Sequence, residues 1–104
     1  MRKNSDTSTK LNTKQRKFLR ARAHPLKVVV TVGAKGLTEP VKEEVELALS
    51  KHELIKLKLP ADDKAIKQDI LDTLSGELKA AQVQLIGRVG ILYRPAEKPL
   101  IVLP

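Results

Sequence analysis

Five consecutive β-branched residues, Val28 to Val32, constrain the fold of this 104-residue chain more than any other stretch. Such a run favours a β-strand, and because it is apolar on both faces we expect that strand to lie centrally in its sheet. The strand must stop at "GAKG" (Gly33 to Gly36), while Thr38, followed by Glu39 and Pro40, is typical of a helix start. The stretch therefore predicts a strand, a glycine loop and a helix in immediate succession.

The other elements follow from the spacing of apolar residues. Asn12 or Thr13 is expected to cap a first helix that runs to about Ala23, where His24-Pro25 stops it. Beyond the glycine loop, the pattern predicts a helix ending near His52, a strand in "ELIKLKLP", a helix capped by Asp62 or Asp63 and ending near Lys79, and two strands, "QVQLIG" and "VGILYR", joined by a tight turn at Arg88.

This order of elements predicts an α/β fold. Two strand–helix–strand units favour parallel neighbours with right-handed crossovers, and the last two strands close the sheet as an antiparallel hairpin. We expect a single two-layer domain over residues 11–104, with a four-stranded mixed sheet and three helices. Polar residues alternate in two strands (Lys56 and Lys58, Gln82 and Gln84), so much of one sheet face should be open to water. Residues 1–10 are polar and aperiodic and are expected to form a disordered basic tail.

The positive charge of the chain is confined to its first third. The formal net charge is +8, yet residues 1–36 contain ten Lys or Arg and a single acid, whereas residues 37–104 contain ten Lys or Arg and eleven acids. A basic tail kept for solubility would explain residues 1–10 but not the structured part. The asymmetry therefore favours a polyanionic partner.

Composition narrows the possible functions further. The chain has no cysteine, which excludes disulfides, thiolate metal sites and cysteine nucleophiles. No apolar run approaches the roughly 18 residues of a membrane span, and the first ten residues lack the apolar middle of a secretory signal. We expect a monomeric cytoplasmic protein that needs no cofactor, acts on no small-molecule substrate and binds no membrane.

The first helix is expected to be amphipathic and basic. On a helical wheel of about 100° per residue, Lys14, Arg16, Lys17 and Arg20 share one arc, and Phe18, Leu19 and Ala23 lie opposite. The apolar side would dock on the domain and leave the cations free to bind RNA. Two further cations of the same third of the chain, Arg22 and Lys27, are included in this primary set.

The glycine loop, formed by Gly33, Ala34, Lys35 and Gly36, is the second candidate RNA contact. Glycine has no Cβ, so another backbone can approach closely, and the free amides of a helix start favour an anion. A GxxG loop clamps the nucleic-acid backbone in KH modules. A lone GxxG is more often only a tight turn, and Glu39 just beyond it opposes an anion. The neighbouring basic helix favours the functional interpretation.

Recognition of bases by stacking is not expected, because aromatic residues make up only 2% of the chain and the two present, Phe18 and Tyr93, are expected in the core. Backbone and shape recognition of structured RNA fits this composition better. Four cations could extend the footprint across the sheet and form a secondary set: Lys56, Lys58, Arg88 and Arg94.

Four stretches together resemble the stand-alone bacterial CRM domain proteins of the YhbY type: "TKQRKFLRARAHPLK", "VGAKGLTEPV", "ELIKLKL" and "IGRVGILYRP". The resemblance covers about Leu11 to Leu103. It implies a fold similar to the carboxyl-terminal domain of bacterial translation initiation factor 3. It also implies binding of ribosomal RNA in precursors of the large ribosomal subunit. One departure concerns the end of the third helix, where relatives carry a glycine and this chain has Lys79.

Two other function classes remain as alternatives. A protein-binding adaptor on ribosomal particles could use the acidic second helix. An enzyme acting on a phosphorylated substrate at the glycine loop is the weaker alternative, because His24 and His52, the only histidines, fit no acid–base or metal-binding spacing. We therefore expect a ribosome assembly factor that is not an enzyme.

Overall fold

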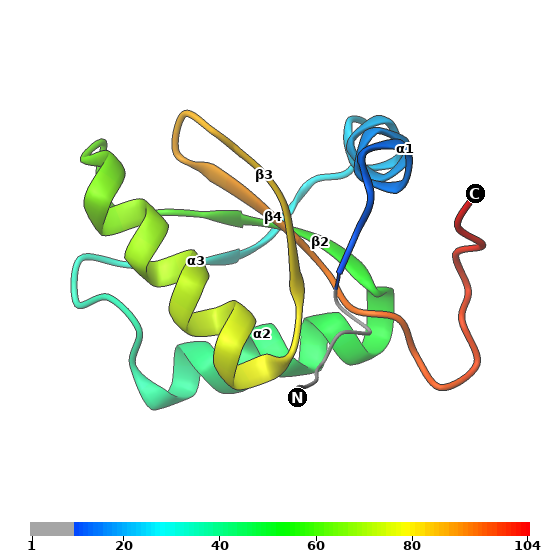
Figure 1. Cartoon of the computed structure of the whole chain (residues 1–104). Helices are drawn as coiled ribbons and strands as arrows, with labels where there is room; N and C mark the ends of the chain where they lie inside the picture. Colours follow the sequence, from blue (N-terminus) through cyan, green and yellow to red (C-terminus); the bar gives the residue numbers. More distant parts are fainter. Residues whose placement is uncertain (1–9) are drawn as a thin grey trace, which may run out of the picture.

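The computed structural model describes residues 10–104 of the chain. The predicted disordered tail over residues 1–10 lies outside the described residues except for Lys10. The elements follow in the predicted order, and their bounds are α1 Thr13–Ala23, β1 Val28–Thr31, α2 Glu39–His52, β2 Leu54–Lys58, α3 Lys64–Leu78, β3 Ala81–Ile86 and β4 Val89–Tyr93 (Figure 1).

The helices begin where the sequence places side-chain caps. The Asn12 side chain accepts a hydrogen bond from the Gln15 amide, and Gln15 bonds back to the Asn12 amide, which forms a capping box. The Thr38 side chain accepts from the Val41 amide to cap α2, and the Asp63 side chain accepts from the Ile66 amide to cap α3. At the end of α3, Lys79 has the left-handed φ of 56° that glycine adopts most readily, so the helix ends at the predicted residue without one.

The four strands form one mixed sheet in the order β1-β2-β4-β3. β1 is parallel to β2, and β4 is antiparallel to both of its neighbours. The second strand–helix–strand unit, β2-α3-β3, does not join neighbouring strands, because β4 lies between β2 and β3. A two-residue turn at Gly87 and Arg88 joins β3 to β4, as the hairpin pattern predicts.

The prediction that Val28–Val32 forms a central strand is wrong, because β1 lies at an edge of the sheet. Only Val30 and Val32 enter the core, while Val28 and Val29 are 40% and 44% exposed. The register also shifts between Val28 and Val30, which marks a β-bulge. A β-branched apolar run indicates that the segment favours a β-strand. It does not indicate whether one or two other strands pair with it.

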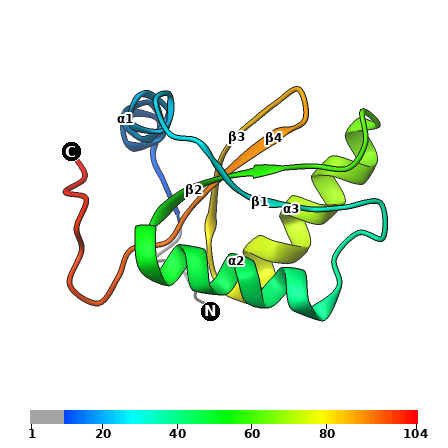
Figure 2. The same cartoon turned by 180° about the vertical axis from the view of Figure 1, so that it is seen from behind.

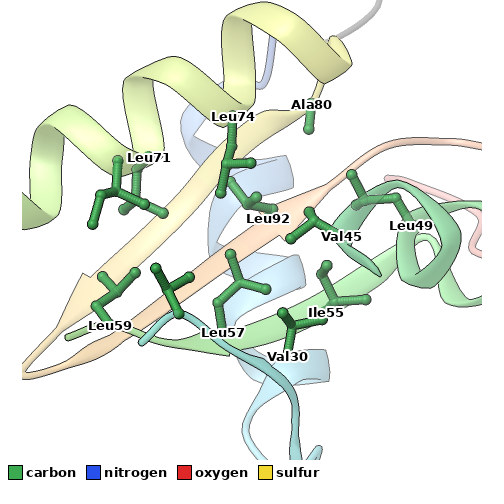
Figure 3. Close-up of a cluster of buried hydrophobic side chains, with 12 residues drawn as sticks. Val30, Val45, Leu49, Ile55, Leu57, Leu59, Leu71, Leu74, Ala80 and Leu92 are labelled. Carbon is green, nitrogen blue, oxygen red and sulfur yellow. The ribbon is translucent and has the colours of Figure 1, made fainter. Parts of the chain in front are cut away.

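The two faces of the sheet carry separate cores. Between the sheet and the pair α2 and α3, aliphatic side chains from the sheet and both helices interdigitate (Figure 3): Val30, Val45, Leu49, Ile55, Leu57, Leu59, Leu71, Leu74, Ala80 and Leu92. On the opposite face, α1 and the C-terminal segment (residues 95–104) enclose a smaller cluster: Leu19, Ala23, Leu54, Val83, Ile91, Tyr93 and Ile101. Figures 1 and 2 show α1 on the opposite side of the sheet from α2 and α3.

The face predicted to be open to water is thus covered at one end and open at the other. Buried Leu54 and Val83 lie under α1, whereas Lys58 and Ile86 at the far ends of β2 and β3 are exposed. At the covered end, the C-terminal segment completes the apolar cluster, and Glu53 holds this segment in place. This buried carboxylate accepts hydrogen bonds from the amides of Ala96, Leu100 and Ile101 at 2.7–3.1 Å.

Candidate nucleic-acid interface

α1 presents a cationic surface because only a narrow stripe of it is buried. Leu19 and Ala23 are fully buried against the sheet, and Phe18 is partly buried. The cations Lys14, Lys17, Arg20 and Arg22 are exposed, and Arg16 is half-buried beside the apolar stripe. The predicted amphipathic basic helix is therefore present in the structure.

The cations of α1 divide between two flanks of the helix. Lys17 and Arg20 face the open end of the sheet, where they line a hollow of about 730 Å³ with His24, Pro25, Gln84 and Ile86, here called the basic hollow. On the other flank, the Arg22 guanidinium lies over the Phe18 ring, 6.0 Å from its centroid. The sequence placed Gln84 on a water-open face but gave no signal that His24 would join the cations.

No carboxylate neutralises these cations within residues 10–104. The ion pairs of the described part join Lys42 to Glu39 and Glu77, Arg88 to Asp62, and Arg94 to Glu46, so all of them belong to the second and third helices and the strands that follow. The charge asymmetry of the sequence is therefore also an asymmetry in space. Among residues 10–104, the α1 side of the domain carries unpaired positive charge, and the α2 and α3 side carries charges of both signs, some of them ion-paired.

In the glycine loop, the two glycines have different structural roles. Gly36 has a φ of 76°, a conformation that other residues rarely adopt, so the turn itself requires glycine there. Gly33 does not have a positive φ, and a Cβ added to it would meet nothing within 4 Å. The fold of the described residues thus gives no steric or conformational reason for glycine at position 33.

The backbone amides of the loop differ in whether they have a hydrogen-bond acceptor. The Gly36 amide donates to the Gly33 carbonyl at 2.9 Å and closes the turn. The amides of Ala34 and Lys35 donate to no acceptor in the described part of the chain, and the Lys35 side chain is exposed. Against this, the loop shares a hollow of about 420 Å³ with Asp69 of α3, whose carboxylate opposes an anion.

The loop and α1 do not adjoin, although the sequence favoured the loop as an RNA contact because of a neighbouring basic helix. Figures 1 and 2 both place them at opposite ends of β1, with the loop at the outer edge of each view. The extended chain from Lys27 to Gly33 spans about 20 Å. Between them lie the exposed Thr31 and Lys58, which are paired across β1 and β2. A partner that touches both ends must therefore follow the strand.

The cations of the secondary set differ in their exposure and in their hydrogen-bond partners. Lys58 is exposed, whereas the Lys56 ammonium donates to the His24 carbonyl at 3.1 Å and ties β2 to the end of α1. Arg88 at the hairpin turn donates to the carbonyls of Leu59 and Pro60. Lys56 and Arg88 thus fasten local structure, although the Arg88 side chain stays partly exposed.

Arg94 is committed to the other side of the molecule. Its guanidinium binds the Glu46 carboxylate through two hydrogen bonds of 2.6 and 2.8 Å and also donates to Leu78 and Ser50. These contacts lower the pKa of Glu46 and raise the pKa of Arg94. Since its donors are occupied beside α2, we leave Arg94 out of the candidate interface.

Three other features of residues 10–104 bear on function: possible metal ligands, the buried Tyr93 and the length of the helices. Among them, no three His, Asp or Glu side chains converge as a metal ion would require. Tyr93 is buried in the core, as the sequence predicts, and burial together with the Glu53 charge raises its pKa. Over residues 10–104, the helices are too short or too polar to cross a bilayer.

Comparison with known proteins identifies relatives over most of the chain. The chain is 51% identical over 96 residues to a Haemophilus influenzae protein named "RNA-binding protein", covering 92% of this chain and 97% of that one. It is 39% identical over 89 residues to the Pseudomonas aeruginosa "Probable RNA-binding protein PA4753", covering 86% of each. The solution structure of the hypothetical protein SAV1595 from Staphylococcus aureus superposes with a TM-score of 0.80 at 30% identity, covering 91% of this chain and all of that one. The CRS1/YhbY (CRM) domain matches residues 11–94, and the chain therefore belongs to the CRM domain family.

Proposed function

We propose that this chain is a non-catalytic RNA-binding protein that docks on structured ribosomal RNA during assembly of the large ribosomal subunit. Its primary contact is the cationic face of α1, carried by Lys14, Arg16, Lys17 and Arg20. The observation that carries the proposal is the absence of any ion pair on these cations within residues 10–104. The names of the relatives support RNA as the polyanion, and the family resemblance supports the ribosomal precursor.

The mode of binding follows from the side chains present. Unpaired Lys and Arg on one helix face contact phosphates, which gives affinity that depends strongly on salt and weakly on sequence. The helix is held rigid by its buried stripe, so its cations are presented in a fixed row. From this face, RNA can follow β1 past Lys58 to the glycine loop, where the free amides of Ala34 and Lys35 would bind a further phosphate.

Charge reversal on α1 tests the proposal. The triple variant Arg16→Glu, Lys17→Glu, Arg20→Glu should lose most of its affinity for an RNA hairpin with a stem of about 16 base pairs. The slope of log affinity against log salt should also fall by about two to three, or about one for each phosphate that the variant no longer binds. The matched control reverses three exposed lysines elsewhere, Lys64, Lys79 and Lys98, and should keep the slope. An unchanged slope in the α1 variant, with an unchanged melting temperature, would remove the helix from the interface.

The identity of the RNA needs a separate experiment. Crosslinking in cells, followed by mapping of both the crosslinked nucleotides and the crosslinked residues, should give large-subunit precursor RNA joined to α1. If crosslinks formed only to other classes of RNA, the protein would still be an RNA-binding protein, but the proposed role in assembly of the large subunit would be overturned.

One observation favours a second candidate, a protein-binding adaptor. Between α2 and α3 lies a hollow lined by Lys42 and four carboxylates, Glu39, Glu43, Glu46 and Glu77, with Leu47 at its rim 66% exposed. Lys42 pairs with Glu39 and Glu77, and Arg94 pairs with Glu46, so the carboxylates still exceed the single lysine of the lining. A basic protein segment would fit its charge. Association with ribosomal particles that survives nuclease digestion of the RNA would favour this adaptor role over RNA binding.

A further inference from the structure

A second hollow, here called the edge pocket, lies beside β1 on the flank of α1 away from the basic hollow. It has a volume of about 590 Å³ and combines two kinds of lining. Four basic side chains surround it, Arg22, Lys27, Lys51 and His52, and no carboxylate of residues 10–104 lines it. These four come from three places in the chain: α1, the loop before β1, and the last turn of α2.

The walls of the edge pocket are apolar and open to solvent. Leu26 is 40% exposed, Val29 is 44% exposed and Leu100 is 73% exposed. Grouped exposed aliphatic side chains mark binding sites more often than isolated ones do. Apolar walls with a cationic rim suit a ligand that has a flat apolar body and a negative charge.

The edge pocket and the proposed RNA surface border the same loop. Pro25 lines both the edge pocket and the basic hollow, so the two hollows meet across the loop that follows α1. An RNA strand seated on Lys17 and Arg20 therefore needs to cross only this loop to reach the edge pocket. The cations Arg22 and Lys27 line its near side, and Lys51 lines it from α2.

Local strand geometry disfavours the main alternative, an acidic peptide added to the open edge of β1. Strand addition needs a regular row of free backbone groups. The β-bulge between Val28 and Val30 interrupts that row at Val29, the β1 residue that lines the edge pocket.

From these observations we infer that the edge pocket binds one unpaired nucleotide of the RNA held on α1. The base lies against Leu26, Val29 and Leu100, and its phosphate lies between Arg22, Lys27 and Lys51. This inference rests on the proposed function and adds to it a preference for RNA with an extruded base. Aliphatic walls replace the aromatic platforms that this chain lacks.

The test compares two RNA hairpins that differ by one bulged uridine in a stem of about 16 base pairs. The wild-type chain should bind the bulged hairpin about tenfold more tightly than the perfect one. Val29→Gln, which makes this wall of the edge pocket polar without changing charge, should abolish this preference and keep affinity for the perfect hairpin. Lys51→Glu should lower affinity for the bulged hairpin by about tenfold more than the control Lys64→Glu does.

The outcomes separate the inference from the proposed function. Equal binding of the two hairpins by the wild type would overturn the edge-pocket inference and leave the proposed function standing. A preference that survives both Val29→Gln and Lys51→Glu would also overturn it. Failure to bind either hairpin would overturn the proposed function itself. An oligoglutamate peptide that shifts the methyl resonances of Leu26 and Val29, where the bulged hairpin does not, would assign the pocket to acidic protein segments instead.

Discussion

The two faces of the sheet are built in different ways. On one face, two helices of 14 and 15 residues cover the sheet and enclose a core of Val, Leu and Ile drawn from both helices and from β1, β2 and β4 (Figure 3). On the other, a helix of 11 residues and the C-terminal segment enclose a smaller cluster. The first face is stable by its own packing, whereas the second depends on a segment that has no regular structure.

The face with the smaller apolar cluster is also held together by a buried hydrogen-bonding group. Glu53, fully buried at the end of α2, binds three amides of the C-terminal segment, and its own carbonyl accepts from the Arg94 amide. The residue adopts a φ of 66°, which is strained for a residue with a side chain. The carboxylate thus holds the C-terminal segment, and Ile101 of that segment packs in the same cluster as Leu19 and Ala23 of α1.

The largest expected effect comes from removing that carboxylate. Glu53→Ala leaves three amides without an acceptor at a cost of about 1–3 kcal/mol each if they stay buried, so we expect a loss of about 3–5 kcal/mol as the segment detaches. Urea unfolding measures this loss, and affinity for the perfect hairpin should fall as α1 loosens. Glu97→Ala, an exposed carboxylate of the same segment, is the control. A stability unchanged by Glu53→Ala would mean that α1 and its cluster hold that face unaided.

A smaller effect should appear in the dependence of stability on pH, with one carboxylate on each face. Burial alone would raise the pKa of Glu53, but its three amides lower it below the ordinary value. Hydrogen bonds from Arg94 lower the pKa of Glu46 on the other face. A lowered folded pKa gives stability that is complete above the unfolded value of about 4.3 and is lost as the pH falls through the folded value.

The unfolding free energy should therefore decrease below about pH 4.5, and Glu53→Gln should flatten this decrease more than Glu46→Gln does. The reason is that Glu53 is fully buried, whereas the Glu46 side chain is 46% exposed and screened by solvent. Urea titrations at a series of pH values measure both slopes. A steeper acid loss in Glu53→Gln than in Glu46→Gln would reverse the ranking of the two faces.

The difference between the faces also explains what the sequence could predict. Helix ends follow from short-range capping, so Asn12, Thr38, Asp63 and Lys79 set the bounds correctly. The role of Glu53 could not be read in the same way, because its partners lie more than forty residues away and nothing in "ELIKLKLP" distinguishes it from a solvated strand start.

The same limit applies to the candidate site. A helical wheel finds the cations of α1, because side-chain direction follows from local geometry. The wheel cannot show that Arg22 faces a different hollow from Lys17, or that Arg94 is held by Glu46, since both depend on which elements become neighbours. The edge position of β1, which separates the glycine loop from α1, is likewise set by strand order and not by the composition of Val28–Val32.

The smallest effects on stability are expected for substitutions in the glycine loop. They show which of the two glycines can be changed without unfolding the loop. Gly36→Ala should cost about 1 kcal/mol because of its positive φ. Gly33→Ala should change the unfolding free energy by less than about 1 kcal/mol, since a Cβ there meets no neighbour. Thermal unfolding of the two variants checks this contrast, and a loss at Gly33 equal to that at Gly36 would make both glycines structural.

The loop can then be tested for RNA contact without unfolding it. Gly33→Asp places a negative charge beside the free amides and should weaken hairpin binding by about tenfold. Gly76→Asp, at an exposed α3 glycine that also has open space around it, is the matched control for net charge. A larger loss of affinity at Gly33 than at Gly76 means that RNA reaches from α1 along β1 to the far end of the sheet. An equal loss in the two variants means that the loop is only a turn and that the interface ends where the cations of α1 and Lys58 end.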